Sequence, residues 1–135
     1  MDQATLVSPD VSAAYEAIAA LEAAKLQRIV ALFAVFPEYG EWRLILSSPS
    51  LDQTHPLKAQ DKVAEILAGR FVYRLPIIMV LPLKDPFMRA LQKWFRNIFP
   101  SLVKVNGHVR LGGQTIGNRF VEDAFLLRLP GVTIA

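Results

Sequence analysis

The side chains with the chemistry for catalysis or metal binding are few, because the sequence has two histidines and no cysteine. Asp52, His55 and Asp61 lie close together in sequence and offer oxygen and nitrogen atoms that suit a hard metal ion. Their spacing matches no common ligand signature, so we predict no metal site and assign His55 to a polar loop that begins a helix. His108 falls at the tip of an expected hairpin, where it would be solvated or paired with a phosphate-like group.

Other local patterns resemble catalytic motifs without completing them. Glu122 and Asp123 are adjacent at the start of an expected strand, so their side chains point to opposite faces and cannot act as a carboxylate pair. Residues 112–117 are rich in glycine but lack the Lys-Ser/Thr ending and the helix of a phosphate loop, which predicts a bend between strands. We therefore predict no catalytic residue and no cofactor.

Charge is distributed unevenly along the chain. Residues 70–120 carry nine lysines and arginines but one acid, Asp85, whereas residues 1–69 have more acids than bases, and the whole chain has a net charge of +3. Such asymmetry favours association with an acidic partner and does not indicate a reaction.

A basic stripe stands out in this segment, since Arg89, Lys93 and Arg96 follow one another at helical spacing. Together with residues of the following strands they form a predicted surface for an acidic protein or a nucleic acid. The predicted binding residues are Arg89, Lys93, Arg96, Lys104, His108 and Arg110. The alternative is that the stripe is an ordinary solvated helix face whose cations pair with the acids of residues 1–69.

A third interpretation is a small-ligand-binding protein, or an enzyme without a known signature. Its pocket would lie between a helix and the sheet, near Arg43, His55 and Tyr73.

Length and composition limit the class of protein. A chain of 135 residues predicts a single domain over residues 1–135, and the 53% apolar fraction predicts an exposed apolar patch and a homodimer. The lack of cysteine, of a secretory signal and of an apolar run long enough to cross a membrane predicts a cytoplasmic protein without membrane attachment.

The elements that must position these residues follow from hydrophobic periodicity and breaker residues. We expect helices over residues 9–26, from Ala59 to a C-terminal cap at Gly69, and from Asp85-Pro86 to Pro100. We expect strands over residues 29–36, 42–46, 71–83, 114–121 and 124–129, and a hairpin over residues 103–111 centred on Asn106-Gly107. This order predicts an α+β domain with a mostly antiparallel sheet, about three helices packed on one face, and the other face partly free for a second subunit.

Two blocks of the sequence resemble a family of uncharacterised bacterial hypothetical proteins. They are Glu-Trp-Arg-Leu at residues 41–44, continuing to Ser-Ser-Pro at 47–49, and Val-Glu-Asp-Ala-Phe at 121–125. The resemblance implies a hairpin after an N-terminal helix, a closing strand and a bacterial cytosolic origin, and it carries no activity over. The leading hypothesis is a non-enzymatic accessory protein that acts as a homodimer.

Overall fold

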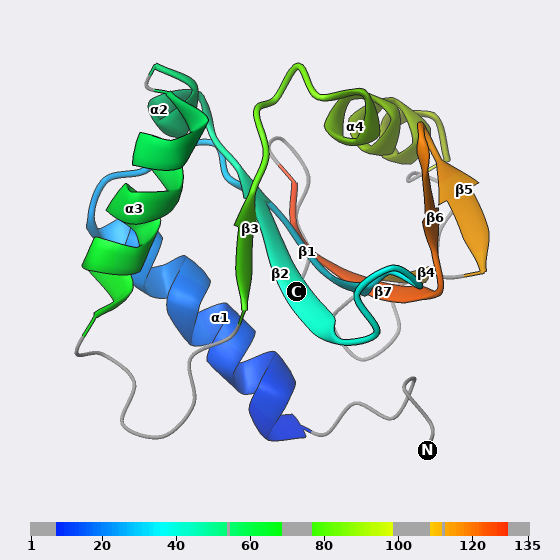
Figure 1. Ribbon diagram of the computed structural model, residues 1–135, viewed down its shortest axis with the longest axis horizontal. Coiled ribbons are helices and arrows are strands. Elements are labelled where there is room, and N and C mark those ends of the chain that lie inside the picture. The colour runs from blue at the N-terminus through cyan, green and yellow to red at the C-terminus, as the bar shows by residue number, and fades with distance from the viewer. Residues whose placement is uncertain (1–7, 54, 69–76, 99–108, 112, 130–135) are drawn as a thin grey trace.

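Among the residues that the structure describes, the main sheet has five strands in the order β3–β2–β1–β7–β4, and β5 and β6 form a separate small sheet (Figure 1). The computed structural model of the chain describes residues 8–53, 55–68, 77–98, 109–111 and 113–129. The strands are β1 (Val30–Val35), β2 (Trp42–Ser47), β3 (Ile78–Val80), β4 (Val109–Leu111), β5 (Gln114–Ile116), β6 (Arg119–Val121) and β7 (Asp123–Arg128). The helices are α1 (Ser8–Ala23), α2 (Pro49–Asp52), α3 (Pro56–Leu67) and α4 (Pro86–Ile98).

Strand pairing confirms the predicted α+β class. Strand β1 pairs antiparallel with β2 and β7, and β7 pairs antiparallel with β4. Strands β2 and β3 are parallel, because α2 and α3 lie in the connection between them and carry the chain back to the same end of the sheet. The sheet is therefore mostly antiparallel, with a parallel strand at one edge.

The central strand β1 is buried along its whole length. Successive side chains of a strand point to opposite faces. Accordingly, Val30 and Leu32 belong to one hydrophobic core and Ala31 and Phe33 to another. The sheet thus separates two cores.

Helix α4 covers the first core. Its side chains Phe87, Met88 and Leu91 are fully buried, and the Phe87 ring meets the Phe36 ring edge to face, with centroids 5.6 Å apart. Burial of one such side chain contributes about 1.5–3 kcal/mol. The helix therefore packs one apolar side against the sheet.

Helices α1 and α3 cover the opposite face, where Ile18, Leu21 and Val63 are fully buried (Figure 1). The prediction of helices on one face was wrong. An uninterrupted apolar strand such as β1 needs cover on both sides, so α4 occupies the face that we expected to be free for a second subunit.

The end of α1 explains why this helix stops short of residue 26. The Leu26 N–H donates to the Leu21 carbonyl (3.1 Å) and the Lys25 N–H to the Glu22 carbonyl (2.9 Å), which is the Schellman arrangement. Lys25 takes a φ of 72°, the left-handed conformation that glycine adopts most easily.

We predict that Lys25→Gly raises the free energy of unfolding by about 1 kcal/mol, because it relieves the left-handed strain of a side-chain-bearing residue. Urea unfolding monitored by circular dichroism measures this change. Lys25→Ala is the control, because it removes the same charge and keeps the strain. Equal stability of the two variants would contradict the explanation.

The connection after β2 contains the short helix α2, which the sequence analysis did not predict. Ser48 is its N-cap: the hydroxyl accepts from the Ser50 N–H (3.1 Å) and donates to the Gln27 carbonyl (2.6 Å). Pro49 follows as the first helical residue, as expected for a proline at this position. The Ser48 hydroxyl thus links the start of α2 to the turn after α1.

Strand β3 lies within the strand predicted over residues 71–83, of which residues 71–76 are outside the described part, and it is at one edge of the sheet that the described residues form. Its outward backbone groups are occupied by α3. The Gln60 carboxamide donates to the Ile78 carbonyl (2.9 Å) and accepts from the Val80 N–H (3.0 Å). One side chain thus takes the place of a neighbouring strand.

In the C-terminal half, β7 confirms the strand predicted over residues 124–129, whereas the strand predicted over residues 114–121 is divided into two by a turn. Residues 103–108 of the predicted hairpin lie outside the described residues, as does Gly69. The glycine-rich stretch is a bend that leads into β5, with Gly113 at a φ of 66°. Residues 114–121 form the hairpin β5–β6, which turns at Gly117.

Candidate binding surface around helix α4

A turn and a cap set the direction of α4. The Asp85 N–H donates to the Pro82 carbonyl (2.9 Å), and this closes the turn before the helix. The Asp85 carboxylate accepts from the Phe87 N–H (2.9 Å), and its carbonyl accepts from the Arg89 N–H (2.9 Å). Asp85 is therefore used as the N-cap, in agreement with the predicted helix start.

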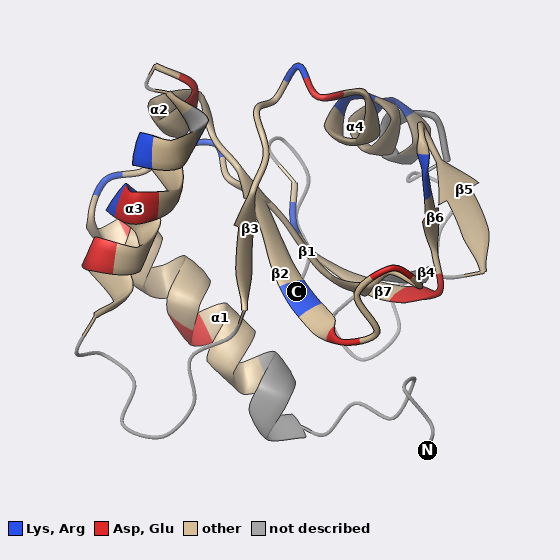
Figure 2. Cartoon of the chain, in the orientation of Figure 1, with Lys and Arg blue, Asp and Glu red and all other residues tan. Residues whose placement is uncertain are grey.

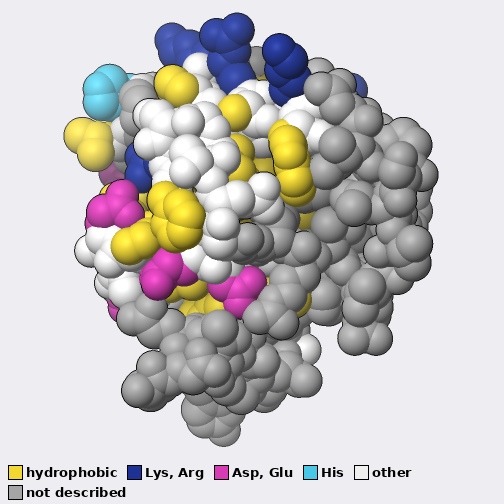
Figure 3. All heavy atoms as spheres, turned by 90° about the vertical axis from the view of Figure 1, so that its right-hand side faces the viewer, with side chains coloured by type: hydrophobic (Ala, Val, Ile, Leu, Met, Phe, Trp, Pro, Cys, Tyr) yellow, Lys and Arg dark blue, Asp and Glu magenta, His cyan; other side chains and the backbone are white. Residues whose placement is uncertain are grey.

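The outer side of this segment is basic. Lys84, Arg89 and Lys93 are exposed, and Arg89 and Lys93 are neighbours on one helix face because they lie four residues apart. We call these three residues the α4 basic surface. Figure 2 shows basic residues on the loop before α4 and along the helix, and Figure 3 shows lysine and arginine side chains gathered at the top of one face of the molecule.

Within the described residues, ion pairs do not neutralise the α4 basic surface. The ion pairs found there join Glu41 to Arg43 (3.6 Å) and Glu22 to Arg128 (3.5 Å). The acids of residues 1–69 therefore do not pair with α4 in this part of the chain. As far as the described residues show, these cations are open to an external anion.

Two of the other predicted binding residues belong to described elements. Arg96 lies in α4, and Arg110 lies in β4 opposite Phe125. Their side chains lie outside the described part, as do Lys104 and His108 altogether.

The pocket predicted from Arg43, His55 and Tyr73 is not assembled by the residues that can be placed. Arg43 lies near the start of β2, with its guanidinium carbon 3.8 Å from the centroid of the Tyr39 ring. His55 follows the opposite end of β2, after α2. Tyr73 lies outside the described residues.

His55 has a structural role. Its Nδ1 accepts from the Leu57 N–H (3.2 Å) and makes it the N-cap of α3, as the sequence suggested. Both carboxylate oxygens of Asp52 lie 3.2 Å from the Leu83 N–H. Among the described residues, no three acidic or histidine side chains lie close enough together to hold a metal ion.

Two arginines stack on aromatic rings at the β1–β2 turn. Arg43 lies over Tyr39, and the guanidinium carbon of Arg119 lies 5.6 Å from the centroid of the Phe36 ring. The Nε atom of each arginine is buried and has no hydrogen-bond partner among the described residues. These arginines pack against the fold and are less available to a partner than the α4 basic surface.

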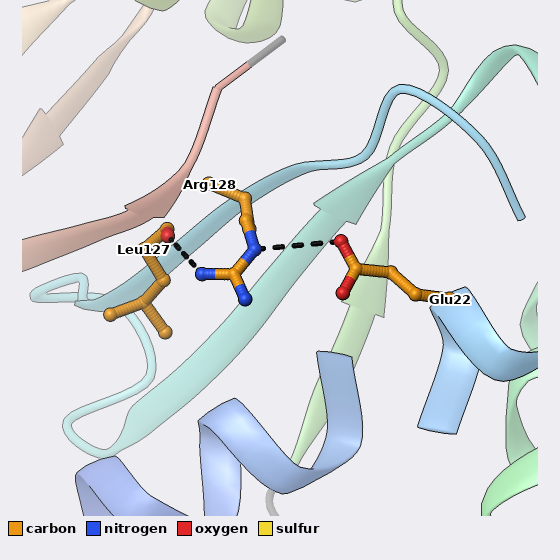
Figure 4. A network of polar contacts seen from close by, with 3 residues as sticks. All are labelled: Glu22, Leu127 and Arg128. Atoms are coloured by element: carbon orange, nitrogen blue, oxygen red, sulfur yellow. Dashed lines mark hydrogen bonds and ion pairs between the residues drawn. The ribbon is translucent and has the colours of Figure 1, made fainter. Parts of the chain in front are cut away.

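Arg128 links β7 to α1 (Figure 4). Its Nε contacts Glu22 at 3.5 Å and its terminal nitrogen donates to the Leu127 carbonyl (3.1 Å). Burial raises the pKa of Tyr15, and the nearby Arg128 charge partly opposes that rise. The Glu22–Arg128 pair is partly exposed to solvent and contributes little to stability.

A small pocket of about 120 Å³ lies next to the α4 basic surface. It is formed by α2, α3 and the segment that runs from the end of β3 into the loop before α4. Its apolar lining is Leu51, Ala59, Val80, Leu81 and Pro82. The charged residues Asp52 and Lys84 also line it, and both are exposed. Sequence reasoning missed this pocket, because its walls come from three segments that no local pattern connects.

Comparisons with protein-family models, with curated proteins and with solved structures found no match. None of the helices in the described part is long and apolar enough to span a membrane.

Proposed function

We propose that this chain is a non-enzymatic accessory protein that binds an acidic partner through the α4 basic surface. The observation that carries the proposal is the exposure of Lys84 just before α4 and of Arg89 and Lys93 on one face of it, with no ion pair to any described acid. Exposed lysines and arginines attract anions and speed association, and they supply no general base at neutral pH.

The homodimer expected from the composition stays a prediction. The sheet face that we assigned to it is covered by α4, so a dimer would have to use another surface. The molar mass in solution, measured by light scattering, decides this point. A bacterial, cytoplasmic setting is part of the same proposal, and the lack of cysteine supports the cytoplasmic part of it.

Charge reversal tests the proposed surface. We expect the double variant Arg89→Glu/Lys93→Glu to bind a fluorescent polyglutamate peptide about tenfold more weakly than the unmodified chain, because two attractions become repulsions. Fluorescence anisotropy at low salt measures the affinity, and binding should weaken as salt is added.

Helix α3 offers a matched control. Lys58 and Lys62 are also exposed and four residues apart, so Lys58→Glu/Lys62→Glu makes the same change in net charge at another place. The proposal expects this control to lose much less affinity. Equal losses in both variants would mean that only net charge matters. Tighter binding of a single-stranded oligonucleotide than of the peptide would favour the nucleic-acid alternative.

A further inference from the structure

The pocket beside α4 has fixed walls. The Leu81 N–H donates to the Leu46 carbonyl (2.9 Å), and the buried Ser47 hydroxyl donates to the Leu81 carbonyl (2.5 Å). The Leu83 N–H is held by the Asp52 carboxylate. These bonds attach the β3–α4 loop to β2 on one side and to α2 on the other. A ligand would therefore meet a preformed cavity, which lowers the entropic cost of binding.

The pocket and the α4 basic surface are continuous. Lys84 belongs to both, since it lines the pocket and precedes α4. Arg89 lies in the first turn of α4 and Lys93 lies one turn further along the helix. The row of cations therefore begins at the pocket with Lys84 and continues along α4. An extended chain advances about 3.3 Å per residue, so a short peptide segment could contact the cations and the pocket together.

The pocket has the size and lining for an aliphatic side chain. A cavity of about 150 Å³ lined by apolar residues can hold a benzene molecule, and this pocket measures about 120 Å³. None of its lining residues is aromatic. A nucleic acid would present phosphates and bases, and bases bind mainly by stacking on aromatic side chains.

We propose that the partner is an acidic peptide segment with one leucine-sized side chain, which fills the pocket while neighbouring carboxylates contact Lys84, Arg89 and Lys93. This inference rests on the proposed function and deepens it. It selects an acidic protein segment over a nucleic acid, because the apolar pocket adds affinity only for a partner with an aliphatic group.

Two labelled peptides of glutamate residues, identical except for a central leucine or alanine, test the inference by fluorescence anisotropy. We expect the leucine peptide to bind about tenfold more tightly, from burial of the larger side chain. In Val80→Phe, the new ring should fill the pocket and remove the preference for the leucine peptide over the alanine peptide. Circular dichroism checks that this variant is folded. The comparison of the two peptides on the unmodified chain requires no substitution in the protein.

The outcomes separate this inference from the proposed function. Equal binding of the two peptides to the unmodified chain would overturn the insertion of a leucine-sized side chain into the pocket. It would leave the proposed binding through the α4 basic surface unaffected. A leucine preference that persists in folded Val80→Phe would also overturn it, because the side chain would then bind elsewhere. Failure of both peptides to bind would overturn the proposed function and this inference with it. An oligonucleotide that binds more tightly than either peptide would also overturn both, and it would favour a nucleic acid as the partner.

Discussion

Gly117→Ala is expected to lower the free energy of unfolding by about 2–5 kcal/mol. Gly117 has a φ of 61°, and a Cβ atom there would lie 2.7 Å from the Pro86 carbonyl oxygen. The left-handed conformation costs an alanine about 1–2 kcal/mol, and forcing a methyl group against backbone adds about 1–3 kcal/mol. The β5–β6 turn packs this closely on the start of α4, so the substitution should also disturb the α4 basic surface.

Gly113→Ala is the matched control for this prediction. Gly113 has a similar φ of 66°, but a Cβ atom there would meet nothing within 4 Å. Its substitution should therefore cost only the conformational part, about 1–2 kcal/mol. Urea unfolding of both variants measures the difference. If they lose the same stability, the β5–β6 turn does not pack on α4 as described.

Gln60→Ala is expected to lower the free energy of unfolding by about 2 kcal/mol, since it removes two hydrogen bonds to backbone at about 1 kcal/mol each. It would also leave the outward Ile78 carbonyl and Val80 N–H without their partner. An open sheet edge pairs readily with another chain. We therefore expect the variant to self-associate as its concentration rises, and light scattering beside urea unfolding measures both effects.

Gln60→Glu separates the two hydrogen bonds. A carboxylate can still accept from the Val80 N–H but cannot donate to the Ile78 carbonyl. The loss of stability should therefore be about half that of Gln60→Ala, or about 1 kcal/mol. If neither variant changes stability or association, Gln60 does not protect the edge.

Much of the fold was predictable because its signals are local. The Asp85-Pro86 pair marked the start of α4, and Gly40 lies in the turn of the predicted β1–β2 hairpin. The placement of the helices on the sheet was predicted wrongly, although the apolar run of residues 29–36 indicated that both faces of the sheet are covered. Such a run is typical of a strand covered on both faces, and we assigned it to a sheet covered on one.

The parallel pairing of β3 is not determined by its local sequence. A strand that follows helical segments can join a sheet at either edge and in either direction, and its own residues do not decide between them. Gln60 stabilises the observed edge position, but a single glutamine on the partly exposed side of α3 has no distinctive pattern in the sequence.

The candidate site was predictable only in part. Helical spacing placed Arg89 and Lys93 together on the outside of α4, and the structure agrees. The importance of Lys84 was missed, because its position at the pocket depends on the turn that Asp85 closes. His55 was offered as a pocket residue, but a histidine directly before a proline at a helix start is better explained as a cap, which is the role it has.

The measurement that tests the central claim most directly is a titration of the isotope-labelled chain with polyglutamate peptide, followed by amide chemical shifts. Binding through the α4 basic surface predicts that the largest shifts fall on Lys84, Arg89, Lys93 and their neighbours, and that they disappear as salt is added. Largest shifts at Lys58 and Lys62 on α3, or no shifts anywhere, would contradict the claim.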